Sequence, residues 1–293
     1  MIFDEKTLRK VNALSLVANK VRPGVMKGER RSAKRGSGVD FADYRDYAPG
    51  DDLRRLDWNV FARLERPFIK LLEEEEDLAV HIVIDASRSM DWGDGECNKF
   101  TFALRLTAGL SAAALSTGDQ LNITLLHGQQ PGKQFGPIRG GQSLMRTLKF
   151  LEAQSAKGTT ELNLALHKYA VRPHRPGLLI LFSDLFSPAG FQQGLSHLAG
   201  HGHEIVLVHL LSPDEVNPPQ AGDLRLLDIE TGVAQEVTLD AGIRRLYTQR
   251  VQTWLGEVKA ECLRSKVRYL PLITDIPWDK FILSEMRRAG VVK

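Results

Sequence analysis

The stretch of the sequence that says most about chemistry is HIVIDASRSM, residues 81–90, where an apolar run ends in an acid. Asp85 directly follows Ile84, and two hydroxyl side chains come at alternate positions, Ser87 and Ser89. A DxSxS spacing can direct three oxygens into one small volume on the loop that leads from a strand to the next helix. Each residue alone has a structural explanation, because Ser often caps helices and Asp often ends strands. A metal site therefore needs support from elsewhere in the chain.

Two other segments place oxygen-bearing side chains beside the ends of predicted elements. KGTTEL, residues 157–162, puts Thr159 and Thr160 just before a helical pattern, and in LILFSD, residues 179–184, a buried strand ends in Asp184. Ligands of open α/β sheets bind beyond the carboxyl ends of the strands, so we expect these oxygens to meet those of the DxSxS motif. Carboxylates and hydroxyls suit Mg²⁺ or Mn²⁺, whereas zinc prefers His or Cys.

The elements that must position these oxygens alternate between strands and helices from residue 79 onward. Short apolar runs separated by helical patterns indicate an α/β fold with a Rossmann-like, mostly parallel, doubly wound sheet. The predicted strands cover residues 79–84, 120–126, 177–182, 204–211 and 267–272. The predicted helices cover residues 100–116, 143–153, 162–171, 191–199, 241–265 and 278–289. Residues 223–238 interrupt the alternation and predict an inserted β-hairpin.

The region before residue 78 divides into two segments of opposite charge. Residues 1–35 hold ten Lys/Arg and three Asp/Glu, a balance of +7, and their apolar spacing over residues 5–20 predicts a basic helix followed by a linker. Residues 36–77 alternate charges with aromatics and predict a small subdomain with an internal salt-bridge network. It would pack on an α/β domain over residues 78–293, with Trp58 as an anchor of that packing. A binding surface is the alternative role for this charged segment.

Composition and length indicate an ordinary globular chain. It has 293 residues, a formal net charge of +3 and 43% hydrophobic residues. No apolar stretch approaches the ~20 residues of a membrane-spanning helix, and the N-terminus lacks a signal-peptide core, so we expect a cytoplasmic protein. Cys97 and Cys262 lie far apart without CxxC spacing, which argues against a disulfide framework or a zinc ribbon. The basic arm lacks the interleaved aromatics of a single-strand binder, which argues against nucleic acid as a partner.

The oxygen-bearing residues resemble the metal-ion-dependent adhesion site of von Willebrand factor A domains. The family pattern selects Thr160 over Thr159, because one residue separates the threonine from a hydrophobic residue, here Leu162. The resemblance implies a Rossmann-like sheet with one divalent ion, Mg²⁺ or Mn²⁺, at its top. In such domains the ion stays partly open, and an acidic side chain of a partner can complete its shell. The implied metal ligands are Asp85, Ser87, Ser89, Thr160 and Asp184.

A second resemblance runs from about Gly36 to the C-terminus. The stretches RDYAPGDD at residues 45–52, RRLDW at residues 54–58 and DIETG at residues 228–232 are similar to the bacterial family known as domain of unknown function 58. Asp40 is a departure, since Glu is more usual there. Members join this N-terminal block to a von Willebrand A-like domain and are commonly encoded beside MoxR-type AAA+ ATPases. The resemblance implies a non-enzymatic, metal-dependent protein-interaction module, acting as an adaptor or chaperone-like partner of such an ATPase.

Three other interpretations of the same residues are weaker. A metal-dependent hydrolase would need a general base or nucleophile beside the cation, and the sequence offers no obvious candidate. A haloacid-dehalogenase-type phosphatase needs a second acid two residues after its nucleophilic Asp, where this chain has Ser87. The three histidines in SHLAGHGH, residues 196–203, could suggest zinc, but two glycines break the helix that would align them.

Overall fold

The computed structural model describes residues 14–18, 39–48, 51–74, 78–218, 222–227 and 234–293. The chain forms two compact units, one made of Met1–Val21 with Leu78–Lys293 and the other of Arg22–Asp77. Among the described residues, no helix has the length and apolar character needed to cross a membrane.

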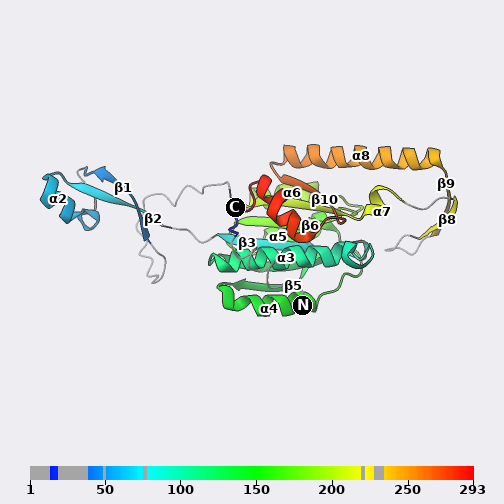
Figure 1. The fold of residues 1–293 in the computed structure, drawn as a ribbon, viewed down its shortest axis with the longest axis horizontal. Coiled ribbons are helices and arrows are strands. Elements are labelled where there is room, and N and C mark those ends of the chain that lie inside the picture. Colours follow the sequence, from blue (N-terminus) through cyan, green and yellow to red (C-terminus); the bar gives the residue numbers. More distant parts are fainter. Residues whose placement is uncertain (1–13, 19–38, 49–50, 75–77, 219–221, 228–233) are drawn as a thin grey trace. The chain divides into compact units, whose positions relative to one another are not determined.

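The larger unit is built around one six-stranded sheet (Figure 1). The strand order is β10-β7-β6-β3-β4-β5, and all neighbours pair in parallel except β5, which lies antiparallel to β4 at one edge. This mixed α/β fold with a mostly parallel sheet confirms the predicted class. The strands are β3 Ala79–Asp85, β4 Gln120–His127, β5 Gln130–Ile138, β6 Leu178–Ser183, β7 Glu204–Leu211 and β10 Arg268–Ile273.

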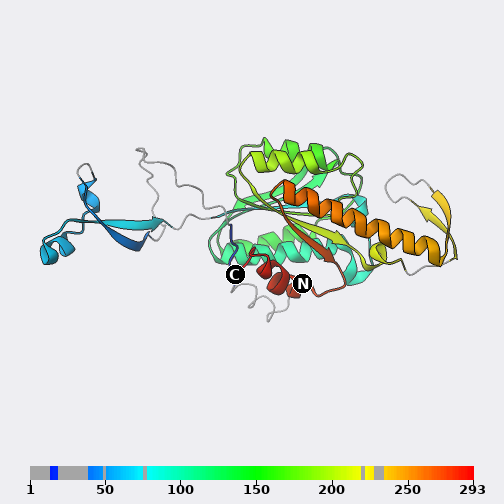
Figure 2. The ribbon, with the colours of Figure 1, turned by 90° about the horizontal axis from the view of Figure 1, so that it is seen from above.

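Helices cover both faces of this sheet (Figure 2). One face packs against α3 Lys99–Ser116, α4 Leu144–Glu152, α9 Trp278–Lys280 and the π-helix Phe281–Met286. The other face packs against α5 Leu162–Ala170, α6 Gln192–Gly200 and α8 Ala241–Arg264. In β3, Ile82 and Ile84 enter the first core and Val83 enters the second, because alternate side chains point to opposite faces. All seven residues of β3 are buried, which explains its unbroken apolar run.

The predicted elements of the larger unit are confirmed, and most of their predicted ends lie within one residue of the observed ends. The exceptions lie at the edges of the unit. Strand β5 was not predicted, because its sequence QPGKQFGPI has two prolines and no apolar alternation, which a strand tolerates at an edge. The last predicted helix begins at residue 278 as expected but winds as a π-helix over Phe281–Met286. The inserted hairpin is present as β8 Gly222–Leu227 paired with β9 Ala234–Leu239.

The predicted N-terminal helix over residues 5–20 is wrong for residues 14–18, the part that the structure describes. Leu16 pairs antiparallel with Val292, and Val17 N donates to Val291 O at 2.9 Å. The side chains of Leu14 and Leu16 are buried in the core of the larger unit. An extended segment buries both leucines in the core. A short helix on its own is only marginally stable in water, so the extended conformation is favoured. The other residues of the predicted helix lie outside the described residues.

The described residues of the smaller unit form two antiparallel strands, a 3-10 helix over Leu53–Arg55 and a short α-helix. β1 Val39–Asp46 pairs with β2 Phe68–Glu74, and α2 Trp58–Leu64 lies between them in the sequence. Asp57 is buried and caps α2, since its carboxylate accepts bonds from Asn59 N at 2.9 Å and Val60 N at 3.2 Å. Its other oxygen accepts a bond from Tyr44 Oη at 2.8 Å.

The structure shows an ion pair among the described charged residues of the smaller unit. Arg45 Nη2 lies 2.8 Å from Asp51 Oδ1 in an ion pair. The Trp58 side chain is 61% exposed. Its predicted role as an anchor against the larger unit stays a prediction. Leu56 and Ile69 are buried. Trp58 is the first residue of the helix that Asp57 caps, and the cap fixes this helix without burying the indole.

The close approach of β3 and β6 can be tested at a glycine. A Cβ atom at Gly177, just before β6, would lie 1.9 Å from Ala79 O in β3. We expect Gly177→Ala to lower the free energy of unfolding by about 2 kcal/mol or more, because two paired strands would have to separate. Gly256→Ala in α8 is the control, since a Cβ there meets nothing within 4 Å and should raise stability by about 1 kcal/mol. Urea unfolding measures both; a Gly177→Ala protein as stable as the wild type would contradict this packing.

Candidate functional site

The predicted acids lie at the carboxyl edge of the sheet, at the ends of two adjacent strands. Asp85 is the last residue of β3, and Asp184 directly follows β6. Ile84 of β3 is paired with Phe182 of β6, so the two strands reach this edge together. From β3 the chain continues to β4 on one side, while β6 lies on the other. Ligands collect at such a switch in strand order.

All five predicted ligand residues are buried, none being more than 8% exposed. Asp85 holds the motif together: its Oδ1 accepts a bond from Ser87 N at 3.0 Å and its Oδ2 a bond from Ser183 Oγ at 2.8 Å. The hydroxyls of Ser87 and Ser89 lie 3.0 Å apart. A carboxylate has about four lone-pair sites, so Asp85 keeps acceptor capacity after these two bonds. The structure therefore brings the three DxSxS side chains into one hydrogen-bonded group.

Backbone hydrogen bonds hold the threonine loop against the DxSxS loop. Arg88 N donates to Gly158 O at 2.7 Å, and Lys157 N donates to Ala86 O at 2.8 Å. Beyond the end of β4, Gly128 forms a parallel bridge with Thr160. Thr160 is buried, and its hydroxyl makes only a long bond of 3.4 Å to a backbone carbonyl, that of Leu126. Thr160 is thus placed beside the motif with a hydroxyl that is weakly engaged.

The fifth residue, Asp184, is bonded to a cation that sequence reasoning missed. Lys99 is fully buried, and its Nζ lies 2.8 Å from Asp184 Oδ2 and 2.6 Å from Glu215 Oε1. The other carboxylate oxygen of Asp184 accepts a bond from Phe186 N at 3.1 Å. The sequence contained a signal for this ion pair. Lys99 lies at helical spacing with apolar residues of α3 that are all buried, and a lysine on such a helix face needs an acidic partner. These residues are Ala103, Leu106 and Leu110.

At the carboxyl edge of the sheet, burial and neighbouring negative charges disfavour the ionised forms of Asp85 and Glu215. Burial, and then the nearby Asp184 carboxylate, raise the pKa of Asp85 to about 6, although hydrogen bonds from Ser183 and Ser87 oppose the shift. Burial also raises the pKa of Glu215, and the Lys99 ammonium opposes that shift. When Asp85, Asp184 and Glu215 are ionised, their three negative charges exceed the one positive charge of Lys99 by two. A divalent cation would neutralise this excess.

The imidazole of His209, close to Asp184, has both ring nitrogens hydrogen-bonded to other groups of the protein. His209 Nε2 lies 3.0 Å from Asp184 O, and its Nδ1 lies 2.8 Å from Tyr269 Oη. Burial lowers the pKa of His209 to about 4, so the ring is neutral at physiological pH. Over the part of the chain that the structure describes, no group of three or more His, Cys, Asp and Glu side chains is arranged to hold a metal. This holds both for residues 196–203 and for the edge that carries Asp85 and Asp184.

Exposed aromatic side chains border the candidate site. Phe186 and Trp92 are each 43% exposed. Phe186 stacks on Trp254 of α8 with ring centroids 5.3 Å apart, and Trp92 Nε1 donates to Asp214 Oδ2 at 3.0 Å. Exposed aromatics beside a polar centre are typical of protein-binding surfaces.

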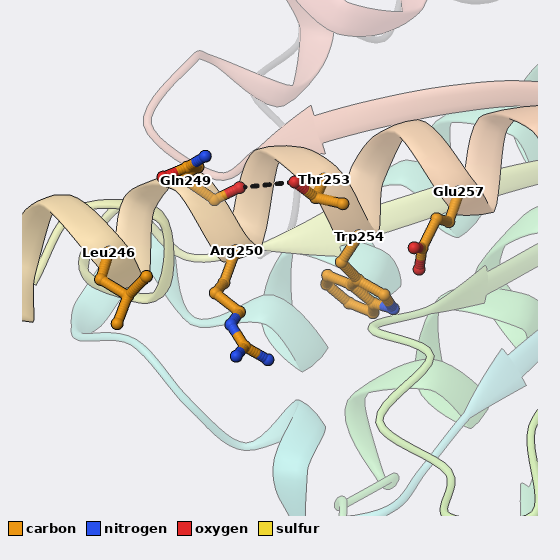
Figure 3. A pocket seen from close by; sticks show the side chains of 6 residues that line it. All are labelled: Leu246, Gln249, Arg250, Thr253, Trp254 and Glu257. Atoms are coloured by element: carbon orange, nitrogen blue, oxygen red, sulfur yellow. Dashed lines mark hydrogen bonds between the residues drawn. The ribbon is translucent and has the colours of Figure 1, made fainter.

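Helix α8 extends this border along a groove (Figure 3). The helix runs past the edge of the sheet toward the β8–β9 hairpin (Figures 1 and 2), and no residue of its first 16 is buried. The groove has a volume of about 400 Å³ and combines apolar, cationic and polar side chains. It is lined by Leu246, Gln249, Arg250, Thr253, Trp254 and Glu257.

Comparison with known proteins identifies the family. The family model described as "Protein of unknown function DUF58" matches residues 43–254. The chain belongs to the DUF58 family. This confirms the second resemblance seen in the sequence. The DUF58 chain is 27% identical over 296 residues to the uncharacterized protein Rv1480 of Mycobacterium tuberculosis, with 98% of this chain and 92% of the relative covered. It is 29% identical over 161 residues to the uncharacterized protein MAV169 of Mycobacterium avium, with 52% and 95% covered.

Solved structures resemble the DUF58 chain more distantly. The conserved hypothetical protein BatB from Bacteroides thetaiotaomicron is 16% identical, with a TM-score of 0.44, and the match covers 73% of this chain and 98% of BatB. An aerotolerance-related membrane protein from Bacteroides fragilis is also 16% identical, with a TM-score of 0.44, and 72% and 99% are covered.

The two buried acids should respond oppositely to neutralisation. Asp85 has a folded-state pKa raised above its unfolded value, so its ionisation lowers stability as the pH rises through about 4 to 6. In EDTA at pH 7.5 we expect Asp85→Asn to raise the free energy of unfolding by roughly 1–3 kcal/mol, and the gain should shrink at pH 4.5. Asp184→Asn leaves Lys99 without one of its two carboxylates and should cost about 3 kcal/mol. Urea unfolding at both pH values measures the effects. A destabilised Asp85→Asn protein would contradict the electrostatics described here.

Proposed function

We propose that this DUF58 chain is a metal-dependent protein-interaction module whose larger unit is a Rossmann-like, von Willebrand factor A-type domain. One Mg²⁺ or Mn²⁺ ion binds at the carboxyl edge of β3 and β6. The observation that carries the proposal is the burial of two carboxylates and three hydroxyls at the switch in strand order, with a net charge that a divalent ion would balance. The proposed ligands are Asp85, Ser87, Ser89, Thr160 and Asp184.

The donor set fits a hard, oxygen-seeking cation. Hydroxyls and carboxylates are ligands that Mg²⁺ accepts, and this ion usually keeps several water molecules. The Ser87 and Ser89 hydroxyls lie 3.0 Å apart, and such neighbouring oxygens can share one ion. When bound, the ion would supply a positive centre for an acidic side chain of a partner. The exposed rings of Trp92 and Phe186 would then give that partner apolar contact beside the ion.

Binding is preferred to catalysis because, among the described residues beside the site, the imidazole and the ammonium group are both engaged by other protein groups. The imidazole of His209 has both nitrogens engaged, and the Lys99 ammonium is held by two carboxylates. A general base must reach the reacting group in a suitable protonation state. The proposed partner is a protein that offers an acidic residue, a MoxR-type AAA+ ATPase in the cytoplasm. The chain would act on it as an adaptor or chaperone-like subunit.

Metal binding tests the site directly. In isothermal titration calorimetry we expect one Mn²⁺ or Mg²⁺ per wild-type chain, and no binding to Asp85→Ala or to the double variant Ser87→Ala/Ser89→Ala, because these lose the central ligands. Asp94→Ala is the matched control, since this acid is exposed on the same loop and caps no helix through its side chain. A purified MoxR-type ATPase should co-elute with the wild type in Mg²⁺ and not in EDTA. Metal binding that survives in both site variants would refute the proposed site.

The hydrolase alternative makes a different prediction. We expect no turnover of p-nitrophenyl phosphate with Mg²⁺ or Mn²⁺ above the rate of the metal in buffer, since no base is directed at the site. Steady-state release of p-nitrophenol from purified wild-type protein measures this. Metal-dependent turnover that Asp85→Asn abolishes would replace the binding module with a hydrolase.

A further inference from the structure

A buried ammonium group engages one of the proposed metal ligands. Lys99 has no exposed surface, and its Nζ bonds to both Asp184 Oδ2 and Glu215 Oε1. The ammonium also lies 5.0 Å from the centroid of the Phe186 ring, which covers it. A buried lysine is tolerated only when its charge is compensated and its protons are bonded. Lys99 is therefore a cation that compensates Asp184.

A divalent ion and this ammonium would compete for the same carboxylate. Both are attracted to Asp184, and two like charges held a few ångströms apart in a buried site repel each other strongly. The oxygen of Asp184 that does not bind Lys99 already accepts the Phe186 amide. An ion that takes Asp184 must therefore share it with Lys99 or displace the ammonium.

Glu215 offers the ammonium a second position. It lies in α7, Pro213–Val216, and its Oε1 binds Lys99 while its Oε2 accepts a bond from Ser212 N at 2.8 Å. Its carbonyl oxygen accepts a bond from Tyr247 Oη of α8 at 2.7 Å. The ammonium can thus leave Asp184 and keep a buried partner. The same residue connects it to the helix that carries the groove beside the site.

We propose that Lys99 is an internal cation that holds Asp184 in the metal-free chain and competes with the divalent ion for it. When the metal binds, the ammonium shifts its bonds toward Glu215. This proposal rests on the proposed metal site and adds how its occupancy is controlled. The chain is then folded in both states, and its metal affinity is lower than the five oxygen donors alone would provide. The divalent ion must reach a sufficient concentration to convert the state with Asp184 bound to Lys99 into the state with Asp184 bound to the metal.

Removal of the ammonium tests the competition. Lys99→Met keeps an unbranched side chain and removes the charge. In isothermal titration calorimetry we expect it to bind Mn²⁺ at least about tenfold more tightly than the wild type, since the repulsion is gone. In EDTA its melting temperature should fall, and saturating Mn²⁺ should raise it by more than it raises that of the wild type, because the metal replaces the missing cation. A purely structural lysine would lose stability without this rescue by metal.

Arg105→Met is the matched control. Arg105 also lies in α3, and its Nη1 pairs with the exposed Glu96 at 3.3 Å, so this variant removes one positive charge from the same helix away from the site. It should leave both the Mn²⁺ affinity and the metal-induced rise in melting temperature unchanged. If Lys99→Met does not fold, Glu215→Gln is compared with Lys99→Met/Glu215→Gln, and the double variant must bind Mn²⁺ more tightly.

The outcomes separate this proposal from the metal site itself. Wild-type binding with equal or weaker binding by the lysine variant overturns the competition and leaves the metal site standing. No Mn²⁺ binding by either protein refutes both. Binding by the lysine variant alone supports the competition in its strongest form, with Lys99 holding the site closed to metal.

Discussion

The burial of charge at the carboxyl edge of β3 and β6 is the constraint that the rest of the larger unit has to satisfy. Asp85 and Asp184 lie where water cannot stabilise them, and isolated buried carboxylates are very costly. Each is therefore surrounded by donors: Ser87 N and Ser183 Oγ on Asp85, and Lys99 Nζ and Phe186 N on Asp184. The two backbone donors lie two residues from the acids they bind, whereas Ser183 and Lys99 lie 98 and 85 positions away from theirs. The fold must close around the acids before these two side-chain bonds can form.

The parallel sheet meets this demand because it brings the carboxyl ends of its strands to one edge. The loops after β3 and β6 supply the acids and serines, and the segment after β4 pairs with the threonine loop through Gly128 and Thr160. After β7, the short helix α7 brings Glu215 to the ammonium. Both hydrophobic cores lie on the faces of the sheet and fix the strands, so the loops can carry polar groups without weakening the packing. The two apolar cores and the candidate site are thus built from different residues.

The sequence was sufficient for the parts of the fold that repeat a simple period. Apolar runs and helical spacing predicted the alternating elements of the larger unit, and the DxSxS spacing pointed to the loop of the candidate site. The same reasoning failed where the structure of a residue depends on partners that are far away in the sequence. Lys99 was missed, because its two acidic partners lie 85 and 116 positions further along the chain. The apolar spacing over residues 5–20 predicted a helix, and only the pairing of Leu16 with Val292 reveals an extended segment at residues 14–18.

The central claim is that the buried oxygens at this edge bind one divalent ion. Crystals of the wild-type protein grown with Mn²⁺ and measured near the manganese absorption edge test it most directly. The claim predicts a single anomalous difference peak within about 2.5 Å of the Ser87 and Ser89 hydroxyl oxygens, with Asp184 in contact or bridged by water. A map with no peak at this edge, or with a peak only at exposed surface carboxylates, would contradict it.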